Sequence, residues 1–152
     1  MLAVLSTIAL AGLSTGCSSL KSGGEHEVTK EQMSLPARAT VDKETAGGHV
    51  EKITKEIERG KTVYDVEATV GGKHMEYLIA EADGALLGTE VPMELDQLPE
   101  PVRVAAEKVF GTTNGLTVMK GVEYGETHYE IEGPKNGKRV EVTFDPAGRP
   151  AK

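Results

Sequence analysis

Glutamates are the residues of this sequence whose type and spacing could do chemistry. A two-residue turn at Asn136-Gly137 sets Glu132 across from Glu141, with Glu130 nearby, and the neighbouring strand places Thr117 beside Glu132. Like charges at facing positions cost roughly 0.2 to 1 kcal/mol. We therefore predict that Glu130, Glu132 and Glu141 bind a cationic partner, either basic protein side chains or a divalent ion. The alternative is a solvated acidic face that keeps the protein soluble.

A second hairpin repeats this pairing but supplies a compensating charge. Its turn at Gly71-Gly72 sets Glu67 across from Glu76, and the register of the preceding strand brings Lys52 beside Glu67. A salt bridge between Lys52 and Glu67 would offset the repulsion between the two glutamates. We therefore predict no binding site at this hairpin.

The sequence lacks the common motifs of catalysis. It contains no HExxH, GxSxG, Walker or dinucleotide-binding pattern, and Cys17 is its only thiol. The histidines, at positions 26, 49, 74 and 128, are not spaced two or four residues apart, so we expect no metal site and no cofactor. His74 and His128 fall on the polar side of different strands and are predicted to be solvated. We expect that the protein is not an enzyme.

The composition narrows the class of partner. The chain has 152 residues, of which 38% are hydrophobic and 27% charged, and its formal net charge is −7. These values are typical of one or two small globular domains. The negative charge argues against a nucleic-acid partner, because binding phosphates needs a basic face. The single cysteine excludes a disulfide within the chain.

The first residues have the pattern of a targeting signal. Residues 1–16 carry no charged side chain and form an apolar run of signal-peptide length. The run ends in LSTGC, residues 13–17, which resembles a bacterial lipoprotein signal, in which small residues precede a cysteine that is acylated and becomes the mature N-terminus. The alternatives are a secretory signal with an incidental cysteine, or a buried apolar helix.

The targeting pattern predicts where the protein is held. Lipid on Cys17 would anchor the chain to a membrane of the bacterial cell envelope, facing the periplasm or the exterior, while the fold stays in water. Residues 17–33 are rich in serine, glycine and charge, and we expect them to form a flexible tether.

The remaining sequence contains an internal repeat. Sliding the chain against itself gives a gapless match at an offset of 65 residues, from Pro36 paired with Pro101 to Ala82 paired with Ala147. Tyrosine, glycine and glutamate positions are identical in both copies, and apolar positions stay apolar. We divide the chain accordingly into residues 34–91 and residues 92–152.

Each copy has the pattern of one helix followed by antiparallel strands. Helical periodicity covers residues 36–46 and 99–110, and the strands after them alternate apolar and polar side chains. We therefore predict an α+β fold of two tandem repeats, each with one helix packed on a three- or four-stranded antiparallel sheet. The expected core residues are Tyr64, Val66, Tyr77 and Ile79 in one repeat, and Tyr129, Ile131, Val142 and Phe144 in the other.

The second copy also carries a family resemblance. The run LPEPVRVAAEKVF, then a strand, then YGETHYEIEGPKNGKRVEVTFDPAG resembles the PepSY-like, or β-lactamase-inhibitor-like, group of small bacterial secreted and lipid-anchored proteins. The resemblance implies a helix and an antiparallel sheet per unit, an extracytoplasmic location, and a role in binding or inhibiting proteins, with no catalytic residues.

Together these observations predict a function class. We expect an extracytoplasmic, lipid-anchored binding module that binds or inhibits a protein such as a peptidase, with an unidentified envelope protein as its partner. The alternative is a structural or cation-binding envelope lipoprotein.

Overall fold

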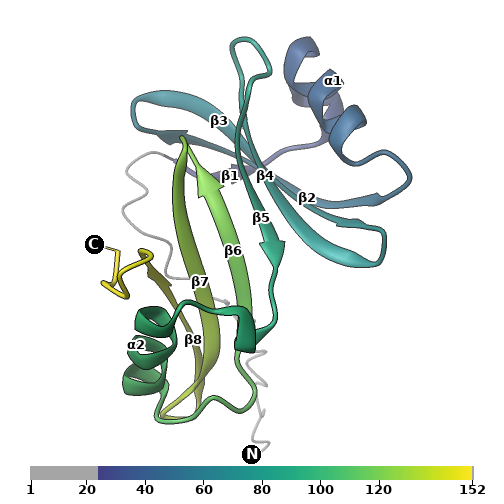
Figure 1. Ribbon diagram of the computed structural model, residues 1–152. Coiled ribbons are helices and arrows are strands. Elements are labelled where there is room, and N and C mark those ends of the chain that lie inside the picture. The colour runs from purple at the N-terminus through teal and green to yellow at the C-terminus, as the bar shows by residue number, and fades with distance from the viewer. Residues whose placement is uncertain (1–23, 152) are drawn as a thin grey trace, which may run out of the picture.

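The computed structural model describes residues 24–151, which fold around one antiparallel sheet (Figure 1). Eight strands pair in sequence order, each with the next along the chain. The strands are β1 (His26–Glu27), β2 (His49–Glu58), β3 (Lys61–Val70), β4 (Lys73–Ala80), β5 (Leu86–Pro92), β6 (Thr117–Glu123), β7 (Glu126–Lys135) and β8 (Lys138–Phe144). The helices are α1 (Leu35–Glu44) and α2 (Glu100–Phe110), with short 3-10 turns at η1 (Lys30–Gln32) and η2 (Leu95–Gln97).

The prediction of two separate repeats, each with its own small sheet, is wrong. β5 pairs with β6 from Gly88 opposite Glu123 to Pro92 opposite Met119, so all strands belong to one eight-stranded sheet. The sequence pattern placed only a short strand near residues 86 and 87, whereas β5 extends to Pro92. A strand of that length at a sheet edge would leave its backbone N–H and C=O groups unpaired, and pairing with β6 satisfies them.

The hairpin registers follow from the turn residues, as predicted. Gly71 and Gly72 both have positive φ, as do Asn136 and Gly137, which is the backbone geometry that a two-residue type I′ turn needs. These turns set Glu67 opposite Glu76 and Glu132 opposite Glu141. The pairing of Lys52 with Glu67 and of Thr117 with Glu132 is also confirmed.

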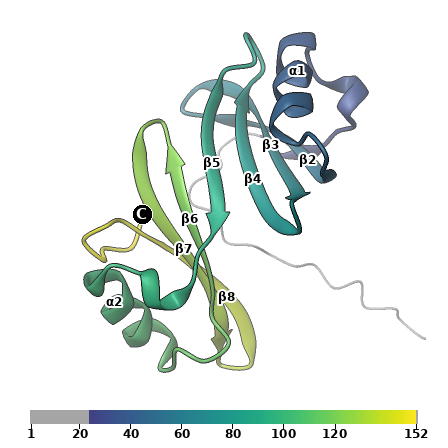
Figure 2. The ribbon, with the colours of Figure 1, turned by 45° about the vertical axis from the view of Figure 1, so that its right-hand side comes forward.

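Both helices cover the same face of the sheet (Figure 2). The register shows why, because residues directly opposite each other on neighbouring strands share a face. Tyr77 on β4 lies opposite Thr89 on β5, which lies opposite Val122 on β6. Tyr77 packs below α1, and Val118, which has the same parity as Val122, packs below α2. Within residues 24–151, no helix covers the other face of the sheet.

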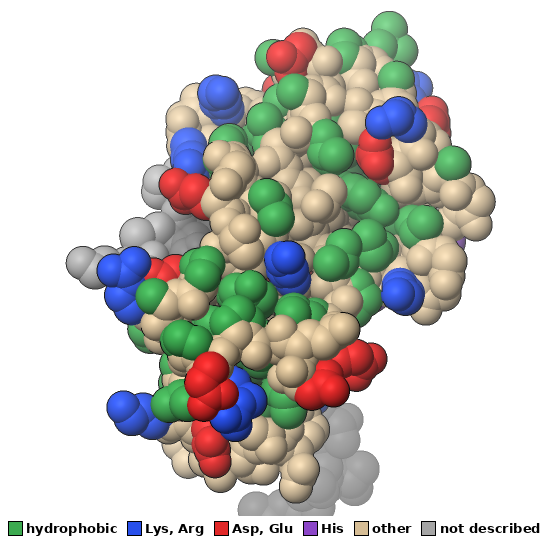
Figure 3. All heavy atoms as spheres, in the orientation of Figure 1, with side chains coloured by type: hydrophobic (Ala, Val, Ile, Leu, Met, Phe, Trp, Pro, Cys, Tyr) green, Lys and Arg blue, Asp and Glu red, His purple; other side chains and the backbone are tan. Residues whose placement is uncertain are grey.

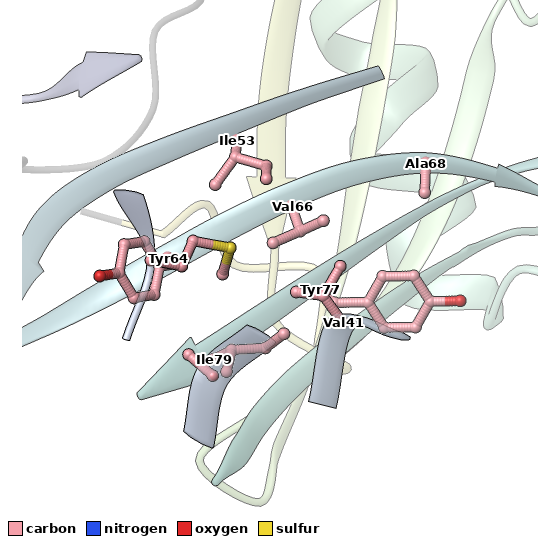
Figure 4. Packing of buried hydrophobic residues seen from close by; sticks show 9 residues of the cluster. Val41, Ile53, Tyr64, Val66, Ala68, Tyr77 and Ile79 are labelled. Atoms are coloured by element: carbon pink, nitrogen blue, oxygen red, sulfur yellow. The ribbon is translucent and has the colours of Figure 1, made fainter. Parts of the chain in front are cut away.

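The first core lies between α1 and strands β2 to β4 (Figure 4). Val41 of α1 meets Tyr64 and Val66 of β3 and Ile79 of β4, all fully buried. The helix begins at Ser34, whose hydroxyl accepts a hydrogen bond from the Ala37 backbone N–H at 3.3 Å. The predicted core residues of this half, Tyr64, Val66, Tyr77 and Ile79, are confirmed.

The second core lies between α2 and strands β6 to β8. Val102, Ala106 and Phe110 face the sheet, and Gly111 ends the helix in the left-handed conformation with φ of 71°. The predicted residues Tyr129, Ile131 and Phe144 are buried here, and Val142 is partly buried against them. Figure 3 shows apolar side chains gathered between the two helices on the face that they share.

The end of the predicted tether is structured. Residues 26 and 27 pair with β2, and Met33 is only 4% exposed in the first core. The polar composition of the segment gave no sign of this apolar contact, which holds the segment against α1 and the sheet. The predicted signal at residues 1–16 and the predicted lipidation at Cys17 lie outside the described residues. Within residues 24–151, no helix combines the length and hydropathy that crossing a membrane requires.

Candidate functional site: an acidic groove

The face of the sheet opposite the helices forms a groove of about 680 Å³ that extends from β2 to β8. Most of the residues that line it alternate along the strands with core residues, such as Glu130 between Tyr129 and Ile131. Among the described residues that line it, twelve are acidic, and Lys52 and Arg59 are the permanently charged cations. The acidic residues are Glu25, Glu56, Glu58, Asp65, Glu67, Glu76, Glu90, Glu123, Glu126, Glu130, Glu141 and Asp145.

One cross-strand row forms the floor of this groove. Along the ladder, Lys52 faces Glu67, Glu67 faces Glu76, and Glu76 faces Glu90. Glu90 then faces Gly121, and Gly121 faces His128. This row places the carboxylates of Glu67, Glu76 and Glu90 on three neighbouring strands, and such facing like charges destabilise a sheet.

Two turns that contribute residues to the groove contact each other. Arg59, in the turn between β2 and β3, places its guanidinium 4.3 Å from the centre of the Tyr124 ring, in the turn between β6 and β7. Arg59 Nη2 also lies 3.2 Å from Glu126 Oε2, and the Tyr124 hydroxyl donates to Glu58 Oε2 at 3.5 Å. These contacts join turns that lie far apart in the sequence.

Two of the three predicted site residues lie in the groove. Burial raises the pKa of Glu130 to about 9, with further contributions from the charges of Glu90, Glu141 and Glu76. Burial also raises the pKa of Glu141, again with the nearby charges of Glu76 and Glu90. Both carboxyl groups therefore resist ionisation, because their surroundings are already acidic and poorly hydrated.

The third predicted residue, Glu132, has a partner that the sequence analysis overlooked. Arg139 on β8 binds both of its carboxylate oxygens, at 2.5 and 2.9 Å, and this interaction lowers the pKa of Glu132. Arg139 faces Pro134 in the ladder and reaches Glu132 diagonally, whereas our prediction considered only directly facing residues. The premise that Glu132 lacks a compensating charge is wrong, and Glu132 is not among the groove residues.

Both glutamates of the first hairpin have a basic partner. Lys52 Nζ lies 2.8 Å from Glu67 Oε1, which confirms the predicted salt bridge. Glu76 Oε1 lies 3.1 Å from His74 Nε2, yet burial, followed by the charge of Glu90, raises the pKa of Glu76. Glu76 on β4 faces Glu90 on β5. The sequence did not predict this pairing, because no two-residue turn sets its register.

The prediction that His128 is solvated is wrong. Its side chain is 18% exposed, and its Nε2 donates to Glu90 Oε1 at 2.7 Å. That hydrogen bond raises the pKa of His128 most, and the negative charges of Glu90 and Glu123 raise it further. Glu123 lies beside this pair, and burial raises its pKa.

The sequence analysis missed Glu90 and Glu123 because it did not predict the pairing of β5 with β6. A usable signal was present in Gly88 and Gly121, two glycines inside strands rather than at turns.

Comparison with known proteins shows the fold. No family model matches the sequence, and no curated protein matches it. Solved structures do match. A protein of Bacteroides eggerthii assigned to the periplasm aligns with a TM-score of 0.56 and 13% identity over 79% of this chain and 86% of its own. A DUF2874 family protein of Bacteroides ovatus aligns with a TM-score of 0.52 and 13% identity, over 80% of this chain and 86% of its own. A BLIP-like protein of Bacteroides fragilis aligns with a TM-score of 0.48 and 19% identity, over 79% of this chain and 84% of its own.

Proposed function

We propose that this protein is an extracytoplasmic binding module whose acidic groove receives a basic segment of another protein. The observation that carries the proposal is the groove itself, in which acidic side chains from β2 to β8 converge on one face. Facing carboxylates repel each other, and positive charge from a partner would add to the relief that Lys52, His74 and His128 give.

The dimensions of the groove favour a polypeptide over a small ion as its main occupant. Neighbouring strands lie about 4.8 Å apart, so seven strands span up to roughly 30 Å, the length of about nine extended residues. One small cation would neutralise only one part of such a surface. A segment that carries several lysines or arginines would face carboxylates along its whole length, and long-range attraction would speed its capture.

The extracytoplasmic location that we propose rests on the sequence and agrees with one protein of the same fold. Residues 1–17 have the lipoprotein-like pattern, and the Bacteroides eggerthii protein of the same fold is assigned to the periplasm. The PepSY-like motifs of the second half also point to a secreted binding or inhibitory protein. We propose a lipid anchor at Cys17, an unidentified envelope protein as the partner, and binding rather than catalysis as the activity.

A charged peptide tests the proposal. The probe is a fluorescein-labelled peptide of alternating lysine and alanine, about ten residues long to match the groove, with an alternating glutamate and alanine peptide as its counterpart. Fluorescence anisotropy should show that the full chain binds only the basic peptide. Binding should weaken strongly between about 0.05 and 0.5 M NaCl, because salt screens exposed charges.

Paired variants separate the groove from general acidity. The double variant Glu76→Gln with Glu141→Gln removes two carboxyl groups of the groove, and we expect it to weaken peptide binding about tenfold or more. The matched control, Asp96→Asn with Glu107→Gln, removes two carboxyl groups from exposed positions near and on α2 that do not line the groove. Equal losses in the two variants would show nonspecific attraction and would refute the groove as the binding site.

A further inference from the structure

Glu90, Glu123 and His128 form a compact cluster at the centre of the sheet. They come from three consecutive strands, β5, β6 and β7, and their potential ligand atoms all lie within 4.8 Å of one another. Glu90 is the most enclosed of the three, with 7% of its surface exposed. The cluster lies in the floor of the acidic groove but differs from the predicted site at Glu130, Glu132 and Glu141.

One buried oxygen of this cluster lacks a hydrogen bond. Glu90 Oε1 accepts from His128 Nε2, but Glu90 Oε2 is buried and has no hydrogen-bond partner in the part of the chain that the structure describes. A buried carboxylate oxygen is unfavourable unless a donor or a cation compensates it. The side chain that is most buried in the groove therefore presents an unused ligand atom beside two further ligands.

Two glycines make room for the cluster. A Cβ atom at Gly121 would overlap the His128 ring, and a Cβ at Gly88 would lie 2.6 Å from Glu123 Cγ. Both glycines lie inside strands with backbone angles open to any residue, so conformation does not require them. Glycine weakens a strand interior, and close approach of another group is a common reason for it. Here that group is in each case a side chain of the cluster.

The donor set matches a borderline divalent metal. Two carboxylates and one imidazole are ligands that Zn²⁺ takes in a four-coordinate site, with water or a partner group in the fourth position. Ca²⁺ and Mg²⁺ prefer six or more oxygens, and an imidazole suits them poorly. Two ionised carboxylates would also balance the charge of the ion. We propose that Glu90, Glu123 and His128 bind one Zn²⁺, with metal replacing the proton shared by His128 and Glu90.

Calorimetric titration of Zn²⁺ into the metal-stripped full chain, in about 0.15 M NaCl to screen nonspecific attraction, tests the site. We expect one Zn²⁺ per chain, and much weaker binding of Ca²⁺ and Mg²⁺. Glu123→Gln and His128→Gln should each weaken Zn²⁺ binding by about tenfold or more. Gly121→Ala, which displaces the histidine without removing a ligand, should weaken it as well. Glu107→Gln on α2 is the control and should bind as the unaltered chain does.

Several results would overturn the site. These are Zn²⁺ binding unchanged in both ligand variants, an equal affinity for Ca²⁺, or a stoichiometry well above one. If the variants fail to fold, nuclear magnetic resonance of the unaltered chain decides, because Zn²⁺ must shift the ring signals of His128 before those of His26, His49 or His74. The readouts are independent of the peptide probe, so this site stands or falls separately from the proposed basic partner.

Discussion

The carboxyl group of Glu130 shows how the acidic groove changes the pKa of a single residue. It is largely buried, and the neighbouring carboxylates help to raise its pKa from 4.5 to about 9. Near neutral pH the folded chain therefore holds a proton on Glu130 that the unfolded chain releases. A group of this kind contributes stability that is fully present below its unfolded pKa and is lost as the pH rises through the folded pKa.

We therefore predict that the free energy of unfolding falls as the pH is raised from about 4.5 to about 9, with a slope from this group of at most about 1.4 kcal/mol per pH unit. Glu130→Gln, which keeps the shape and removes the titration, should flatten this dependence. It should also raise stability at pH 8 by about 1 kcal/mol or more. Urea unfolding across the pH range measures both effects. A slope as steep in Glu130→Gln as in the unaltered chain would contradict the prediction, and Glu107→Gln serves as control.

Tyr129, on the opposite face, has the contrasting role. Tyr129 is 7% exposed and packs among the residues of the second core, so its ring is a structural element and not part of the groove. We predict that Tyr129→Ala lowers the free energy of unfolding by about 3 kcal/mol or more, because it leaves a cavity. Chemical denaturation measures the loss, and a loss under about 1 kcal/mol would mean that the ring is not buried in solution.

At the scale of elements, the hairpins could be predicted from the sequence and the central pairing could not. Gly71-Gly72 and Asn136-Gly137 form two-residue turns, and a turn of that length sets the register of every residue on both strands. Strand β5 reaches β6 through a long connection that contains α2, and such a connection sets no register. The cluster of Glu90, Glu123 and His128 depends on that pairing, which is why alternation alone could not reveal it.

The same pairing predicts how the elements unfold. Because β5 and β6 join the two halves into one sheet, we expect a single cooperative transition. Thr89→Pro removes a backbone N–H from a central strand and should destabilise both halves, with faster amide exchange in β7 as well as in β4. Thr89→Ala keeps the N–H and is the matched control. Exchange in β7 that stays unchanged in Thr89→Pro would show that the halves fold independently.

For the molecule as a whole, the division of the two faces is the feature that links fold to function. The helices and both cores occupy one face of the sheet, and the other face carries the acidic side chains. A structural sheet could leave its second face neutral, with alternating threonines or paired charges. Here many of the acidic side chains line one groove, with the cluster of Glu90, Glu123 and His128 in its floor. This division of the faces supports our proposal that the groove receives a positively charged segment.

Anchoring at a membrane surface is the remaining proposal for the whole chain, and it rests on Cys17. The cysteine ends an apolar run and has no other thiol in the sequence to pair with. Each acyl CH₂ that enters the bilayer contributes about 0.8 kcal/mol, so more than one chain on Cys17 would hold the protein stably. We predict that Cys17→Ser moves the protein from the membrane fraction to the soluble fraction, measured by fractionation after salt and carbonate washes, while Ser22→Ala stays with the membranes. Cys17→Ser that remains in the washed membranes would refute lipid anchoring at this residue.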